Sequence, residues 1–161
     1  SKRTPAFSNT DEARAEREDV NRAFVDVADQ RARTADVLRG IAAASGPVVV
    51  HCTEGKDRTG WIAALLQLIA GADEEGVIRE YLLSNDYRRD LIETEVDKVQ
   101  RTKGALSAKI ARLQLEVDGA YLTAGLDEVA ADYDDLQGFL TQGLGLDQAT
   151  IDALRAKLRR G

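Results

Sequence analysis

Apolar residues recur at intervals of three and four positions over most of this chain, the spacing that lines one face of an α-helix. A first such stripe runs from about residue 20 to residue 44, where Ser45, Gly46 and Pro47 interrupt it. Its apolar members are Phe24, Val27, Ala28, Ala35, Leu38 and Ile41. The stripe predicts one amphipathic helix over this range.

The helical pattern continues towards the C-terminus. Residues 59–71 are apolar almost all round and predict a buried helix, whereas residues 73–103 predict more exposed helices. Three further stripes predict helices in the last part of the chain. They consist of Leu106, Ile110, Leu113 and Val117, then Leu122, Leu126, Val129 and Tyr133, and finally Ile151, Leu154 and Leu158.

One segment departs from the helical pattern. Residues 47–52 contain the β-branched run Val48–Val50 and predict a strand that is buried on both faces. Such a strand needs a neighbour on each edge, and no other segment predicts one. We therefore expect an α/β fold whose remaining strands lie upstream of this sequence. Residues 1–19 are expected to be a polar arm or linker, and residues 20–161 the C-terminal portion of a single domain.

Composition narrows the classes of function. The net charge of −6 argues against a nucleic-acid partner, which needs a basic face. No apolar run reaches the roughly 18–20 residues of a membrane span, and no signal peptide opens the sequence. A single cysteine and a single histidine exclude an internal disulfide and any zinc cluster rich in Cys or His. We expect no metal and no cofactor.

The cysteine and the histidine are adjacent, at the start of the loop HCTEGKDRTG (residues 51–60). A loop that leads from an apolar strand into a helix N-terminus presents free backbone N–H groups to an anion. Gly55 permits the turn that the loop needs. The same field favours the thiolate of Cys52, and the planar fork of Arg58 suits two oxygens of a phosphate. The loop therefore predicts phosphoryl transfer through a cysteine nucleophile.

Other chemistries match these residues less well. A Walker A loop is excluded because Val50 occupies the place of its first glycine and Asp57 follows the lysine. A Cys–His protease pair is disfavoured because adjacent strand residues point to opposite faces. His51 is therefore expected to face away from the substrate and to support the loop by hydrogen bonding.

The Cys-x5-Arg-Thr pattern of this loop resembles the signature of cysteine-dependent tyrosine phosphatases. Its GKDRTG form is similar to that of the atypical bacterial tyrosine phosphatases. Further likeness extends over roughly residues 20–160 and includes NRAFVDV, IREYLLSNDYR and the segment from GAYLTAGLDEV onward. The resemblance implies a cysteine-phosphatase-like fold with a parallel-sheet core flanked by helices, of which this chain supplies mostly the helical C-terminal part.

The resemblance also implies roles for the loop residues. Cys52 would be the nucleophile, Arg58 the phosphate clamp, Thr59 the stabiliser of the leaving thiolate and Asp57 the general acid. Lys56 would meet a second phosphate of a phosphoinositide. The substrate-binding set is Thr53, Glu54, Gly55, Lys56, Asp57 and Arg58.

The leading hypothesis is a phosphatase for phosphotyrosine, with phosphoserine, phosphothreonine and phosphoinositides as further substrates. The expected partners are a phosphorylated protein or phosphoinositide, and an N-terminal segment of the same domain that this sequence lacks. Two alternatives stay open: a phosphate-binding module or inactive fragment, and a rhodanese-like sulfurtransferase or arsenate reductase. The expected location is the cytoplasm, or outside the cell after export without a conventional signal peptide.

Residues near the loop have interpretations of their own. The amphipathic stretch 86–117 predicts either a helical lid that shields Cys52 from water and oxidants, or ordinary packing. Trp61 is expected in the core or in the pocket wall. Arg88 and Arg89 are expected at the surface rather than at an anionic substrate.

Overall fold

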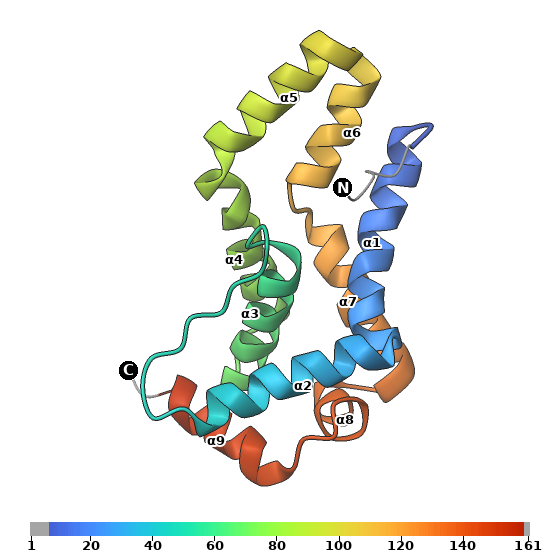
Figure 1. Ribbon diagram of the computed structural model, residues 1–161. Helices are drawn as coiled ribbons and strands as arrows, with labels where there is room; N and C mark the ends of the chain where they lie inside the picture. Colours follow the sequence, from blue (N-terminus) through green and yellow to red (C-terminus); the bar gives the residue numbers. More distant parts are fainter. Residues whose placement is uncertain (1–6, 160–161) are drawn as a thin grey trace.

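The computed structural model describes residues 7–159, and the regular structure of that part is helical (Figure 1). The elements in chain order are α1 (Thr10–Asp26), α2 (Ala28–Ala43), α3 (Asp57–Ala70), α4 (Glu74–Tyr87), α5 (Arg89–Lys103), α6 (Ala105–Leu115), α7 (Gly119–Tyr133), the short α8 (Leu136–Gly138), the π-helical turn η1 (Phe139–Gly143) and α9 (Gln148–Leu158). None of the helices within residues 7–159 is both long enough and apolar enough to cross a membrane.

The expected α/β fold, with a cysteine-phosphatase-like parallel-sheet core, is wrong for the described residues, which contain no strand. The segment 47–52 has no regular structure and connects α2 to α3. Val49 is 86% exposed and Val48 is 46% exposed, so neither is buried on both faces. A β-branched run forms a strand only where a neighbouring strand pairs with its backbone N–H and C=O groups. Within residues 7–159 the core is built by helices that pack on helices instead.

The N-terminal part is more ordered than its polar composition indicates. Residues 1–6 of the expected arm lie outside the described residues, but residues 10–19 belong to α1. Asn9 caps this helix by accepting a hydrogen bond from the backbone N–H of Glu12 at 2.9 Å. The Glu12 carboxylate in turn accepts from the backbone N–H of Ser8 at 2.9 Å. The cap therefore starts a helix in a segment that was expected to be loose.

The single helix expected over residues 20–44 is two helices, because the backbone becomes extended at Val27 (φ −88°, ψ 117°). The Arg31 side chain donates to the carbonyls of Val25 and Asp26 at 2.6 and 2.8 Å, which satisfies the end of α1. The break lets α1 pack along α7 and α6 while α2 turns away to pack on α9 (Figure 1).

Three of the later helices, α4, α7 and α9, also start at an acidic cap. Asp73, Asp118 and Asp147 each accept a hydrogen bond from a backbone N–H of the first turn, at 2.7, 3.0 and 2.8 Å. Such a cap satisfies one of the unpaired N–H groups at the N-terminus of a helix. These short local signals explain why the later helical boundaries follow the sequence pattern.

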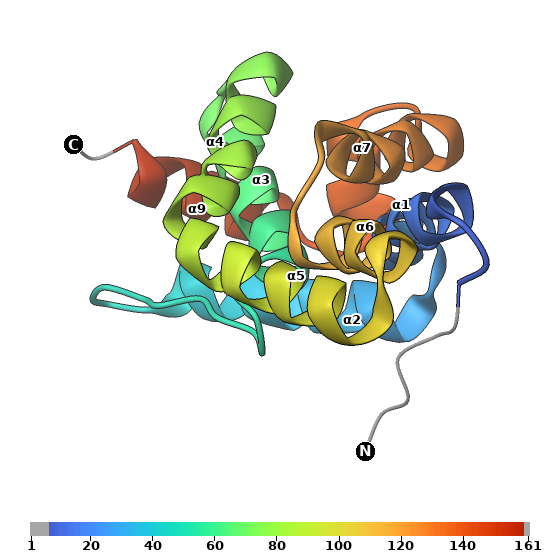
Figure 2. The same ribbon diagram turned by 90° about the horizontal axis from the view of Figure 1, so that it is seen from above.

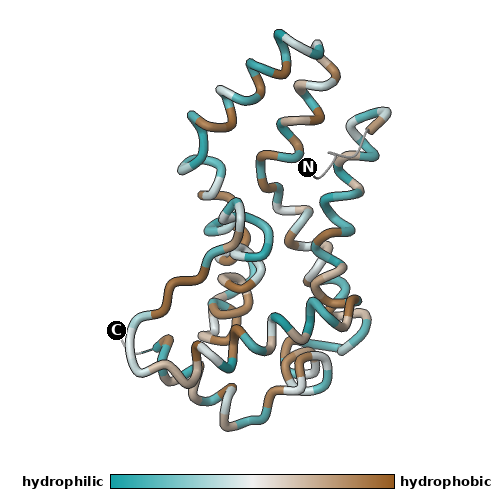
Figure 3. Tube along the Cα trace, viewed as in Figure 1, coloured by the Kyte–Doolittle hydropathy of each residue, from teal (hydrophilic) through white to brown (hydrophobic). Residues whose placement is uncertain are grey.

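Helix α3 runs through the main core and is its most apolar element (Figure 3). Trp61 is 1% exposed and lies at the centre of an aromatic group. Its ring stacks on Phe24 at 5.7 Å between centroids and meets the ring of Phe139 edge-on at 6.1 Å. The expectation that Trp61 is a core residue is confirmed. This packing fixes the helix that carries the loop residues.

Helices α5 and α6 form a hairpin that extends away from the main body (Figure 1), and the view from above shows them side by side (Figure 2). A separate small apolar cluster, centred on Ile92, Val96 and Ala108, holds the two helices together. At the base of the hairpin, Asn85 bonds both the N–H and the C=O of Val117 at 2.8 Å. The hairpin is thus anchored at its base and attached along α6 to α1.

Candidate active site

The loop 51–56 turns sharply above the N-terminus of α3, and Gly55 makes that turn possible. Its φ of +70° is in the left-handed region that glycine occupies without steric cost. In this conformation the backbone N–H of Gly55 donates to Sγ of Cys52 at 3.2 Å. The loop therefore aims a backbone donor at the sulfur.

The surroundings of Cys52 favour its thiolate. Partial burial alone raises the pKa of the thiol. The effect of neighbouring polar groups is larger and lowers the pKa; these groups are the Thr59 hydroxyl and the backbone of Thr59, Glu54 and Gly55. Together they lower the pKa from 9.0 to about 7. A donor that stabilises the charged form of a group shifts its pKa in this direction. A large fraction of Cys52 is therefore thiolate near neutral pH.

Thr59 lies in the first turn of α3, with its hydroxyl buried. Within the described residues this oxygen has no hydrogen-bond partner at ordinary distance, although it is close enough to lower the pKa of Cys52. A buried hydroxyl without a partner is costly, and the Cys52 sulfur, whose pKa this hydroxyl lowers, is a polar group close to it. The position suits a donor that strengthens its bond when Cys52 carries a full negative charge.

Arg58 is exposed beside the sulfur. One guanidinium nitrogen donates to the Thr53 hydroxyl at 3.1 Å, which holds the side chain over the loop. Both pockets that border Cys52 include Arg58 in their walls. The fork is thus available to an anion that approaches Cys52.

The larger of these two pockets has a volume of about 840 Å³. One wall is the loop, with Cys52, Asp57 and Arg58. The opposite wall is the α5–α6 hairpin, which contributes four apolar and four polar side chains. The apolar side chains are Val99, Ile110, Ala111 and Leu115, and the polar ones are Glu95, Lys103, Ser107 and Gln114. The stretch expected as a lid therefore borders the nucleophile.

The smaller pocket, of about 380 Å³, lies on the other side of Cys52 against α2. Its wall includes Trp61, Val50 and His51. His51 is exposed, and its ring makes no hydrogen bond within residues 7–159. The supporting hydrogen bond expected of His51 thus stays a prediction.

Asp57 is the first residue of α3 and lines the larger pocket together with Cys52. Its carboxylate is 20% exposed and has two cationic neighbours. The Lys56 ammonium lies 3.3 Å from Oδ2, and the Arg17 guanidinium of α1 lies 3.5 Å from the same oxygen. The carboxylate is therefore held between a loop residue and a residue of another helix.

Lys56 is 0% exposed, whereas the other residues of the loop are exposed or half-buried. Its ammonium faces the interior, next to Asp57, and does not line either pocket that borders Cys52. Burial lowers the pKa of Lys56; the Asp57 carboxylate opposes this shift and Arg17 adds to it. In this conformation Lys56 forms an ion pair with Asp57. A contact between Lys56 and substrate stays a prediction.

Two more predicted residues meet at the edge of the loop. The Glu54 carboxylate lies 3.9 Å from Arg88, at the junction of α4 and α5. Arg88 also donates to the carbonyl of Leu115 at 2.7 Å, so it joins the loop to the base of the hairpin. Arg89, in contrast, is exposed and pairs with Asp86. Arg88 is thus an anchor for the hairpin rather than a solvated surface charge.

Arg17 is the residue of this site that the sequence pattern missed, because it lies in the segment expected to be a polar arm. Asn9 and Glu12, three positions apart, are the helix-start signal that would have placed Arg17 on a helix. Sequence gives no sign, however, that this face of α1 meets the loop.

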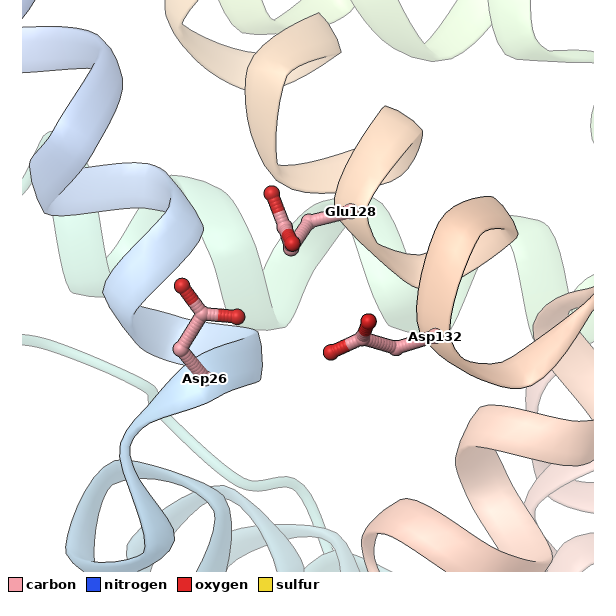
Figure 4. Close-up of side chains that lie close together, drawn as sticks. All are labelled: Asp26, Glu128 and Asp132. Carbon is pink, nitrogen blue, oxygen red and sulfur yellow. The ribbon is translucent and has the colours of Figure 1, made fainter.

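An acidic group lies elsewhere, at the C-terminal ends of α1 and α7 (Figure 4). Carboxylate oxygens of Asp26, Glu128 and Asp132 lie within 4.8 Å of one another. Partial burial and the charges of the other two carboxylates raise the pKa of Glu128. None of these residues borders the pockets around Cys52.

The sequence of this chain is similar to those of known tyrosine phosphatases. Residues 1–160 match the model of a tyrosine phosphatase family. The triple specificity protein phosphatase PtpB of Mycobacterium tuberculosis is 33% identical over 131 residues, which cover 73% of this chain and 46% of that protein. A protein of Cupriavidus necator named as a tyrosine-protein phosphatase is 31% identical over 104 residues, 65% of this chain and 37% of the relative. A tyrosine-protein phosphatase of Nostoc commune is 28% identical over 130 residues, 76% and 42% of the two chains. The chain spans less than half the length of these relatives.

Proposed function

The chain belongs to the tyrosine phosphatase family, and on that premise we propose that it hydrolyses phosphotyrosine through a phosphocysteine intermediate at Cys52. The observation that carries the proposal is the lowered pKa of Cys52, about 7, at the floor of a pocket that Arg58 also lines. A thiolate beneath a cationic fork is suited to attack a bound phosphate.

In the first step, the Arg58 fork and the loop N–H groups bind the oxygens of the phosphate. The Cys52 thiolate attacks phosphorus in line with the leaving oxygen, so that an S–P bond forms as the P–O bond to the tyrosine ring breaks. The carboxylic acid of Asp57 gives its proton to the leaving oxygen. Asp57 supports this role because its side chain borders the same pocket as the sulfur.

In the second step, a water molecule attacks the phosphocysteine. The Asp57 carboxylate accepts a proton from that water, the P–S bond breaks, and inorganic phosphate leaves. The electron pair returns to sulfur as thiolate. The buried hydroxyl of Thr59 and the N–H of Gly55 donate to this thiolate and make it a better leaving group.

The wall opposite the loop supports phosphotyrosine as the substrate. The aromatic ring of phosphotyrosine suits the apolar side chains of Val99, Ile110 and Leu115. Phosphoserine, phosphothreonine and phosphoinositides are further candidates, since the relative from Mycobacterium tuberculosis is named a triple specificity phosphatase. A pocket of about 840 Å³ is large enough for head groups of these sizes.

The test is phosphate release from a phosphotyrosine peptide, a phosphoserine peptide and a phosphoinositide panel, with a metal chelator present. Release from the phosphotyrosine peptide that disappears in Cys52→Ser supports the proposal. Release that Cys52→Ser leaves unchanged contradicts it. Phosphate binding without release would instead indicate a binding module, and transfer of sulfur from thiosulfate to Cys52 would indicate a sulfurtransferase.

A further inference from the structure

We propose that Arg17 of α1 is a positioning residue for Asp57, and that it keeps the Asp57 carboxylate turned towards the leaving group of the substrate. This inference rests on the proposed function, in which Asp57 is the general acid. It starts from the position of Arg17, which lines the same pocket as Cys52, Asp57 and Arg58 although it comes from a distant part of the chain.

The carboxylate of Asp57 has two cationic neighbours that lie in different surroundings. Lys56 approaches both of its oxygens, at 3.4 Å to Oδ1 and 3.3 Å to Oδ2, and is entirely buried. Arg17 approaches Oδ2 at 3.5 Å and borders the pocket. The two cations therefore share Oδ2, which Lys56 approaches from the interior and Arg17 from the side of the pocket.

Loss of Arg17 would leave Lys56 as the sole cationic partner. A buried ammonium needs a paired charge, because an unpaired one costs several kcal/mol. The carboxylate would then turn further inward and pair fully with Lys56. In that orientation Asp57 would be farther from the leaving oxygen, and a misplacement of roughly 1 Å can lower a rate by about a hundredfold.

Arg17 is itself held in place. Its side chain is 11% exposed, and Nε lies 3.2 Å from a carboxylate oxygen of Glu16. Gln114 of α6 lies 3.4 Å from the same Glu16 oxygen and 3.3 Å from the carbonyl of Ala13. Nε is buried and makes no hydrogen bond within the described residues, so both of these contacts of Arg17 are ion pairs. A partly buried guanidinium held between the Glu16 and Asp57 carboxylates has little freedom left to lose, which suits a positioning role.

The chain Gln114–Glu16–Arg17–Asp57 connects the hairpin wall of the pocket to the general acid. Gln114 also lines the pocket. Three of the four helices that line the pocket, α1, α3 and α6, are therefore linked to the acid, and Arg17 is the member of this chain that contacts it.

The experiment measures kcat for two substrates that differ in their need for an acid. Phenyl phosphate has a basic leaving group and needs protonation, whereas 4-nitrophenyl phosphate has a far weaker base as leaving group and needs little. We expect Arg17→Met to lower kcat for phenyl phosphate at least about tenfold more than kcat for 4-nitrophenyl phosphate. Arg17→Lys, which keeps the charge, recovers part of the loss.

The matched control is Arg22→Met on the same helix, since Arg22 pairs with Glu18 and Asp19 and does not border the pocket. It is expected to leave both rates unchanged. Equal losses for the two substrates in Arg17→Met, or no loss, would overturn the positioning role. If Arg17→Met does not fold, as judged by circular dichroism, the same comparison is made with Arg17→Gln and Arg17→Lys.

The variant Asp57→Asn separates this inference from the proposed function. If Asp57→Asn shows the leaving-group dependence and the Arg17 variants do not, Asp57 is the acid and Arg17 does not position it. If Asp57→Asn itself lacks the dependence, the assignment of the acid is wrong and the role of Arg17 is overturned with it. Cys52→Ser is measured alongside. Loss of all its activity would support Cys52 as the nucleophile, whatever the Asp57 and Arg17 variants show.

Discussion

The backbone N–H of Gly55 lies 3.2 Å from Sγ of Cys52 and donates a hydrogen bond to it. This contact depends on the left-handed conformation of Gly55, whose φ is +70°. Every other residue type pays a steric cost in this conformation, because it carries a Cβ atom. The hydrogen bond from the Gly55 N–H to the sulfur therefore depends on a glycine at this position.

Gly55→Ala is therefore expected to lower both stability and rate. A Cβ at this position meets no atom within 4 Å, so the cost comes from the backbone alone and amounts to about 1–2 kcal/mol of the unfolding free energy. Urea unfolding and phosphate release would measure the two effects. Gly46→Ala is the control, because it also meets no atom and its φ is not positive. Equal effects of the two substitutions would contradict this account.

The pKa of Cys52, about 7, predicts the pH dependence of its reactivity. Thiolate forms as pH rises, so alkylation by iodoacetamide should rise with pH and reach half its maximum near pH 7. Removing a donor that stabilises the thiolate raises the pKa. We therefore expect Thr59→Val to move the midpoint up towards 9.0, and Thr59→Ser, which keeps the hydroxyl, to leave it near 7. A midpoint that does not move in Thr59→Val would exclude the hydroxyl as a donor.

The grouping of the loop residues around Cys52 was predictable because it is local. Cys52, Gly55, Arg58 and Thr59 lie within one turn and the start of one helix, so their spacing alone brings them together. Contacts between distant segments leave no such trace. The pairing of Arg17 with Asp57 depends on how α1 packs against the rest of the molecule, and periodicity does not specify that.

The error over residues 47–52 has the same origin. Composition describes what a segment prefers, and Val48–Val50 prefer a strand. Whether a strand forms depends on a partner, which the described residues do not provide. Lys56 shows that residue spacing is also insufficient within the loop. Spacing placed Lys56 in the loop, but it did not predict that the ammonium turns inward to Asp57.

The α5–α6 hairpin offers a test of the lid interpretation, which we propose for residues 86–117. Replacing residues 97–108 by a short Gly/Ser linker removes Val99, Lys103 and Ser107 from the pocket wall. The base would stay anchored through Asn85 and Arg88. We expect faster oxidation of Cys52 by hydrogen peroxide, because the thiolate loses its cover.

The control for the hairpin variant is its melting temperature, which distinguishes loss of cover from loss of fold. A shortened hairpin with unchanged melting and an unchanged oxidation rate would reduce this segment to a packing element.

Trp61 tests the contribution of the core behind the loop. Trp61→Ala removes a ring that contacts Phe24 and Phe139, and we expect a loss of about 3–5 kcal/mol in unfolding free energy. Tyr87, which is 85% exposed, provides an aromatic control: Tyr87→Ala should stay within about 0.5 kcal/mol. Urea denaturation measures both, and similar losses would contradict the assignment of the core.

The most direct test of the central claim is to trap the covalent intermediate. The protein would be mixed with excess phenyl phosphate, quenched in acid within a single turnover, digested and analysed by mass spectrometry. We predict a phosphoryl group on the peptide that contains Cys52, and its accumulation in Asp57→Asn if the second step is slowed more than the first. A phosphoryl group on another residue, or turnover with none on Cys52, would contradict a cysteine-dependent mechanism.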